Sequence, residues 1–344
     1  MASIFKQFQP DDVTNLLTLL HEAVPITGSI ISGTYGDDTL ASGTNIKNYT
    51  HGRFQSVYDY PYLSASSNHV FDISVGMATS SAYTVATESQ QKAAMYNQKA
   101  QVLMGYDATG SIQPFDIDGD LSTGGDKMKE VFFVDFSRLL YKDEIKKGSF
   151  SITLMTASYA TPYDSGSSQW TINDSGSATS FKVNSPAGEY AILKDSTAPN
   201  TARGLIFYQA GIAVLSASGG PFADMSASTS ESFEAQLTSS AISSSCDGLR
   251  HRIFDLSFNN TIELNSSVYF VRVKHNEFNY SSNPTYLSAS KIVTKTVKKN
   301  APVSYISGIE LLAADGAVLA RAKLSELIKN SSDQETTLRT RIDY

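Results

Sequence analysis

Hydrophobic and polar residues alternate along much of the middle of the chain. In the stretch SFSITLMTASYA, Phe150 and Ile152 alternate with Ser151 and Thr153, which is the two-residue period of a strand with one buried face. The stretches QWTIND, SFKV, EYAILKD and GLIFYQAGIAVLSAS follow, separated by short turn-forming sequences such as DSG. No helical period long enough for a crossover connection interrupts them. The pattern therefore predicts an antiparallel β meander over residues 148–218.

The segment from residue 219 to residue 344 combines a helical pattern with further strand patterns. SESFEAQLTSSAISSSCDGLRHRIF is helical in its first half, after which FDLSF and SVYFVRVK alternate. The dipeptide Asp315-Gly316, which suits a tight hairpin, lies between two apolar runs. The terminal TTLRTRIDY alternates Leu338 and Ile342 with arginines. We predict a C-terminal helix plus an antiparallel β region that ends in a paired strand.

The start of the chain has the pattern of an amphipathic helix. Val13, Leu16, Leu17 and Leu20 lie on one helical face, directly after Pro10 and two aspartates. This apolar face is narrow, and an isolated helix of this length is marginal in water. We therefore expect an N-terminal helix that must dock on another surface.

Three more elements are predicted within residues 1–147, which makes this region mixed α/β. Thr87 and Gln90 form a capping-box pattern ahead of KAAMYNQKAQVLMGY, which predicts a helix over residues 88–104. KEVFFVDF is a nearly continuous apolar run of strand length. SRLLYKDEIKKG has the pattern of a short helix closed by Gly148.

These patterns predict a mainly β (α+β) chain, made of antiparallel β meanders or sandwich-like domains with a few short helices. Its expected parts are an N-terminal mixed region at 1–147, an inserted β-rich domain at 148–218 and a C-terminal region at 219–344. Composition supports the class, because 344 residues with 41% hydrophobic and only 18% charged residues suit a folded, turn-rich β protein.

Charge and cysteine content exclude several classes of partner and compartment. The net charge of −7 argues against nucleic-acid binding, which depends on clustered lysine and arginine. The basic run from Lys291 to Lys299 is interpreted as a solvated strand edge. The single cysteine, Cys246, excludes an internal disulfide, and no apolar run approaches the ~20 residues that cross a bilayer. MASIFKQFQPDD lacks the features of a secretory signal. We expect folding in the cytosol and no membrane partner.

Motifs for catalysis or metal binding are weak or missing. DIDGDLSTGGD, Asp116 to Asp126, offers carboxylates at alternate positions as a calcium loop does, but the sixth and twelfth positions hold Leu121 and Lys127. We interpret it as a solvated acidic turn. The five histidines show no zinc spacing, Cys246 lies in no nucleophile signature, and phosphate- and dinucleotide-binding motifs are missing. We therefore predict no enzyme, no catalytic residue, no metal and no cofactor, while a glycosidase-type carboxylate pair stays open because its separation is spatial.

HNEFNYSSNPTY, from His275 to Tyr286, is unusually dense in aromatic and amide residues. Phe278 and Tyr280 are two positions apart, so on an extended segment both would enter the core beside the preceding strand. Pro284 holds the residue before it extended, and Tyr286 supplies a further ring to bury. We predict a structural corner whose interface candidates are His275, Phe278, Tyr280, Pro284 and Tyr286.

The same stretch carries a resemblance to a family. FNNTIELNSSVYFVRVKHNEFNYSSNPTYLSASKI, PVSYISGIELLAADGAVLARAKLSELIK and LRTRIDY resemble the C-terminal part of virion structural proteins of T4-like marine myoviruses, especially from the tail and baseplate region of cyanophages. PAGEYAILKD, GLIFYQAGIAVL and MYNQKAQVLMGYD are similar to the same group. The resemblance covers much of the chain, but not residues 28–68.

The resemblance implies a structural subunit of a contractile phage tail, made in the host cytoplasm and located in the virion. Its partners would be copies of itself and other virion proteins, in a homo-oligomer or another symmetric assembly. Two alternatives stay open: a neck or capsid-associated structural protein, and a virion-associated glycan hydrolase with the loop from Asp116 to Asp126 as its first suspect.

Overall fold

The computed structural model describes most of the chain, and the described part is mainly β, as the alternation predicts. The described residues are 5–26, 46–58, 69–79, 87–121, 127–158, 169–225, 232–239, 242–275, 277–278, 287–288, 291–292, 303–331 and 333–344.

The described part contains more strands than helices. The helical elements are η1 (Pro10–Asp12), α1 (Thr87–Leu103), α2 (Arg138–Tyr141), α3 (Pro221–Asp224), α4 (Phe233–Ser239) and α5 (Ile242–Arg250). The strands are β1 (Val13–Ile26), β2 (Ile46–Asn48), β3 (Phe54–Tyr58), β4 (His69–Met77), β5 (Glu130–Phe136), β6 (Glu144–Ile145), β7 (Ser151–Met155), β8 (Gln169–Asn173), β9 (Lys182–Ser185), β10 (Gly188–Asp195), β11 (Ala202–Phe207), β12 (Ile212–Ser216), β13 (Ile253–Val273), β14 (Leu287–Ser288), β15 (Lys291–Ile292), β16 (Val303–Leu312), β17 (Val318–Ser331) and β18 (Thr336–Asp343).

The chain forms two compact units. Unit 1 contains Met1–Leu19 and Glu263–Tyr344, and unit 2 contains Leu20–Ile262. The long strands β1 and β13 each contribute residues to both units.

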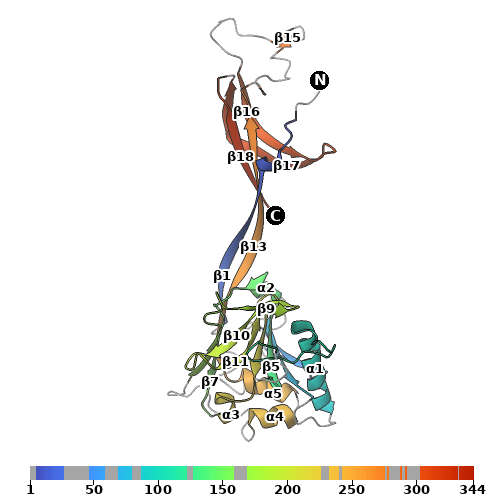
Figure 1. Ribbon diagram of the computed structural model, residues 1–344. Helices are drawn as coiled ribbons and strands as arrows, with labels where there is room; N and C mark the ends of the chain where they lie inside the picture. The colour runs from blue at the N-terminus through green and yellow to red at the C-terminus, as the bar shows by residue number, and fades with distance from the viewer. Residues whose placement is uncertain are drawn as a thin grey trace. The chain divides into compact units, whose positions relative to one another are not determined.

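Unit 2 is built on one large sheet. From β13 the strand order is β13-β7-β8-β10-β11-β12-β5-β4-β3-β2, while β6 pairs with β13 and β9 with β10 (Figure 1). The pairs from β7 to β12 are antiparallel, with registers such as Ile152↔Ile172 and Leu205↔Val214. These pairs confirm the predicted meander. Its strands form a single sheet with strands that come before the meander in the sequence, β2 to β5, and with β13, which comes after it.

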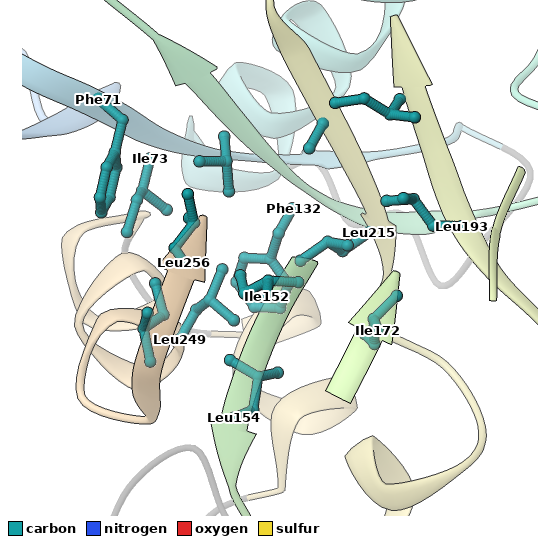
Figure 2. Close-up of a cluster of buried hydrophobic side chains, with 14 of the residues drawn as sticks. Phe71, Ile73, Phe132, Ile152, Leu154, Ile172, Leu193, Leu215, Leu249 and Leu256 are labelled. Carbon is teal, nitrogen blue, oxygen red and sulfur yellow. The ribbon is translucent and has the colours of Figure 1, made fainter. Parts of the chain in front are cut away.

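The central strands of unit 2 are buried on both faces, which explains their continuous apolar runs. In β5, Phe132 and Val134 belong to one hydrophobic cluster, and Val131 and Phe133 belong to another on the opposite face. The first cluster includes side chains from α3, α4 and α5, and the second includes side chains from α1. Figure 2 shows the first cluster, in which labelled side chains from strands and from α5 converge: Phe71, Ile73, Phe132, Ile152, Leu154, Ile172, Leu193, Leu215, Leu249 and Leu256.

Unit 1 consists of shorter ladders. β18 pairs antiparallel with β13 from Ser266↔Asp343 to Val273↔Thr336, which confirms the predicted terminal strand. β16 and β17 form a hairpin, with the turn at Asp315-Gly316 where the sequence places it. Gly316 has φ +88°, a value that favours glycine.

The expected N-terminal helix is wrong. Pro10–Asp12 form a short 3-10 turn, and the leucines that follow lie in the 14-residue strand β1. A spacing of three and four residues fits a helix, but β1 instead pairs with β13, a partner about 240 positions away in sequence. Local periodicity carries no information on such a distant partner.

Two further expectations need correction. The predicted region borders at 147/148 and 218/219 both fall inside unit 2, because β12 pairs with β5 and β7 pairs with β13 across them. The helix expected up to Gly148 ends at Tyr141, and the two-residue strand β6 follows it. By contrast, α1 and β5 lie where the sequence predicts them, although the side chain of Thr87 is outside the described part.

Candidate interaction surfaces and polar sites

The strand β1 is the last strand in the sheet order and exposes much of its apolar surface. Its leucines Leu16, Leu17, Leu19 and Leu20 are between 44% and 57% exposed. Further along the same strand, Ile26 belongs to the core of unit 2. Single exposed apolar residues are common, but four within five residues form the kind of surface that partners cover.

One edge of β1 is held by β13 through side chains as well as through the ladder. The Ser267 hydroxyl donates to Asn15 Oδ1 at 2.8 Å, and Arg272 Nε lies 3.0 Å from Asp12 Oδ1. Nearer the other end, the backbone N–H of Glu22 donates to the Asn260 side chain at 3.0 Å. Among the strands that the structure describes, none pairs with the other edge of β1. That edge offers backbone donors and acceptors to another strand.

The two faces of the hairpin of β16 and β17 differ in its middle. Ile309 pairs with Ala322, and on the opposite face Glu310 pairs with Arg321 in an ion pair of 2.6 Å. Leu327, in β17, is 62% exposed. A two-stranded hairpin is marginal by itself in water, so its apolar face is a second candidate contact surface.

The corner after β13 is anchored chiefly by Glu277. Its carboxylate lies 2.8 Å from Lys6 Nζ and accepts the backbone N–H of Lys274 at 3.2 Å. Its carbonyl accepts the Asn330 side chain at 2.9 Å, and Asn330 is fully buried. Glu277 therefore connects the N-terminal segment, the end of β13 and the end of β17.

The structure describes two of the five interface candidates predicted at this corner. His275 is exposed and lies 3.5 Å from Glu335. Phe278 is half-buried, and its carbonyl accepts a hydrogen bond from Ser304. The expected extended conformation is wrong at Phe278, which has φ +54° and so does not continue a strand. The other three candidates lie outside the described residues: Tyr280, Pro284 and Tyr286.

A polar row crosses three strands of unit 2 that the sequence did not connect. The register aligns Ser56 with Asp72 and Asp72 with Asp135. The Ser56 hydroxyl donates to Asp72 Oδ1 at 2.5 Å, His69 Nε2 lies 2.8 Å from the same oxygen, and Lys99 Nζ lies 2.6 Å from Asp135. Burial raises the pKa of Asp135, and Lys99 opposes this.

This row lacks the geometry of a nucleophilic site. Activation of Ser56 by His69 in a Ser-His-Asp arrangement would need the imidazole between the hydroxyl and the carboxylate, but Ser56 and His69 each contact Asp72 directly. An aspartate inside each of two apolar strands, HVFDISV and EVFFVDF, was the signal available in the sequence. Cys246 is fully buried, and burial raises the pKa of its thiol, so it is not poised to react.

The acidic loop after α1 brings three carboxylates together. One oxygen from each of Asp116, Asp118 and Asp120 lies within 4.8 Å of the others. Asp116 is fully buried and forms an ion pair with Lys127, whereas Asp118 and Asp120 are exposed. These are the described residues that could hold a metal ion.

Comparisons with known proteins add no relative. No family model matches the chain, and no curated protein or solved structure is similar to it. Within the part of the chain that the structure describes, no helix combines the length and apolar character needed to cross a membrane.

Proposed function

We propose that the chain is a structural protein of a contractile-tailed bacteriophage virion, located in the tail or baseplate and working through protein–protein contacts. The resemblance of its C-terminal segments to virion proteins supplies the class. The observation that carries the assembly mechanism is β1, which has one edge that no described strand pairs with and four leucines about half exposed.

An edge strand of this kind is a liability in a protein that stays alone. Monomeric proteins protect such edges with charges, prolines or bulges. β1 has Pro25 near its end, but the segment from Leu16 to Leu20 consists of four leucines and Thr18. It therefore contains neither a charge nor a proline. Covering a half-exposed leucine contributes about 1 kcal/mol, so four of them favour association before any backbone hydrogen bond is counted. We infer that a strand from another subunit, either a copy of this chain or a neighbouring virion protein, covers this edge.

The test compares the oligomeric state of the purified wild-type chain with that of a variant that carries charges on β1. Leu17→Lys with Leu19→Lys places two ammonium groups on one face of the strand, where they oppose pairing. Val102→Lys is the matched control, because Val102 is also a large exposed apolar residue but lies on α1. We expect the wild-type chain and the control to form the same oligomer by light scattering, and the β1 variant to be folded but dissociated.

Incorporation into particles tests the virion location. Mass spectrometry and cryo-electron microscopy of purified particles should find the chain in the tail or baseplate, with copies or neighbours in contact at β1. A folded β1 variant that assembles like the wild type would contradict the role of this edge. A chain found only outside the particle would contradict the virion assignment.

A further inference from the structure

Unit 1 buries very few hydrophobic side chains for its length. Among the described residues, only Val268, Val273 and Leu338 are buried hydrophobic residues of this unit. The two hydrophobic clusters of the described part lie entirely in unit 2. Buried polar residues are more numerous in unit 1, and they are Asp12, Ser266, Ser267, Ser304, Asn330 and Ser331. A unit that folds by itself owes its stability chiefly to its own hydrophobic core, which the described part of unit 1 lacks.

Exposed apolar side chains show the opposite distribution. Nine of the fifteen large hydrophobic residues that are exposed in the described part belong to unit 1, although this unit contains less than a third of the chain. They lie in the N-terminal segment, β1, β16, β17 and the C-terminus: Phe5, Leu16, Leu17, Leu19, Tyr305, Val318, Leu319, Leu327 and Tyr344. Interfaces of obligate oligomers resemble a domain core cut in half. The apolar side chains that a core requires are therefore present in unit 1, but they are exposed.

The charge distribution favours a copy of this chain as the partner of unit 1. Unit 1 has 12 lysines and arginines and 10 aspartates and glutamates, so its net charge is +2. The corresponding numbers for unit 2 are 15 and 24, so its net charge is −9. A net charge far from zero opposes association, and a net charge near zero promotes it. Copies of unit 1 can therefore associate with little repulsion, whereas copies of unit 2 repel one another.

We propose that unit 1 acquires its hydrophobic core only when copies of this chain associate, which rests on the assembly function proposed above. Folding of unit 1 and formation of the oligomer are then one process. Unit 2 has its own two clusters and folds in the monomer. Because a unit of this kind has no stable folded monomer, its stability depends on the concentration of the chain.

Hydrogen exchange of the full chain in urea, at several chain concentrations, tests this coupling. The amides of β16, β17 and β18 should lose protection at the urea concentration at which light scattering shows the oligomer dissociating. That midpoint should rise with chain concentration. The amides of β5 and β12, in unit 2, should lose protection at a higher urea concentration that is independent of chain concentration.

Three results of this experiment would overturn the proposal. Unit 1 amides that stay protected in the monomer would mean that another part of the same chain supplies the core. A unit 1 midpoint that does not change with chain concentration would show that association does not stabilise this unit. A chain that is monomeric at every concentration would exclude a copy of itself as the partner.

A charge at an exposed apolar position away from β1 separates this proposal from the role of the β1 edge. Leu319 is 65% exposed in β17 and would be buried in the oligomer, so Leu319→Lys should weaken association by about tenfold or more. The matched control is Val183→Lys, because Val183 is 71% exposed in the strand β9 of unit 2, and it should associate as the wild type does.

The charged β1 variant completes the comparison. If Leu319→Lys associates as tightly as the wild type while the β1 variant dissociates, the role of the β1 edge stands and a core shared through unit 1 is refuted. If Leu319→Lys dissociates while the β1 variant associates normally, the shared core stands and the role of the β1 edge is refuted.

Discussion

A buried lysine gives a sharp prediction on the stability of unit 2. Lys92, in α1, is 1% exposed, and its Nζ donates to the carbonyl of Leu237 at 2.6 Å and of Gln236 at 3.3 Å near the end of α4. Burial lowers its pKa to about 8, and the nearby Cys246 and Glu88 only partly oppose this. The change to make is Lys92→Met, which keeps the apolar stem and removes the titrating group.

The magnitude follows from the difference between the two pKa values. A shift from 10.5 to about 8 corresponds to about 3 kcal/mol of unfolding free energy. Between these pH values the unfolded chain binds more protons at Lys92 than the folded chain, so the stability of the wild type rises with pH. The full penalty for burying the charge is present below pH 8, and it is relieved as the pH approaches 10.5.

Urea unfolding at a series of pH values measures this effect. Trp170 is the single tryptophan, it is buried in unit 2, and its fluorescence reports on the unfolding of that unit. Subtracting the free energy of Lys92→Met cancels the other titrating groups. The difference should move in favour of the wild type by about 3 kcal/mol between pH 7 and pH 10.5. A difference that stays constant with pH would refute the reasoning, because it would mean that Lys92 titrates alike in the folded and unfolded chain.

Two further predictions concern anchoring residues. Asp174 accepts hydrogen bonds from the Gly148 N–H, the Phe150 N–H and the Tyr208 hydroxyl at 2.7 to 2.9 Å, so Asp174→Ala should lower the unfolding free energy by about 3 kcal/mol or more. Urea unfolding measures this against the exposed neighbour Ser175→Ala, and equal stabilities of the two variants would count against it. Glu277→Gln should cost only about 0.5 kcal/mol, since its ion pair with Lys6 is partly exposed, but it should speed trypsin cleavage after Lys6. An unchanged cleavage rate would show that the ion pair does not hold the N-terminal segment.

The sequence predicts those elements whose stability is encoded locally. The strand β5 and the meander were predictable because their apolar runs fit strands buried on one or both faces. The helix α1 was predictable from its length and capping pattern. β1 was not, since its leucines fit a helical face equally well and its partner β13 lies far along the chain.

The candidate sites were less predictable than the fold for the same reason. The row of Ser56, Asp72 and Asp135 depends on strand register, which no local spacing encodes. Phe278 takes a positive φ that is uncommon for a bulky residue, so its departure from the strand could not be inferred. The spacing of the acidic loop was visible in the sequence, but the burial of Asp116 and its ion pair with Lys127 follow from the fold.

The central claim is that another subunit covers the edge of β1 that no described strand pairs with. Cryo-electron microscopy of the assembled particle, or of the oligomer that the purified chain forms, tests it most directly. We predict density for a strand from a second subunit hydrogen-bonded along β1, with Leu17 and Leu19 buried at the contact. Subunits that touch elsewhere and leave this edge open to solvent would contradict the account.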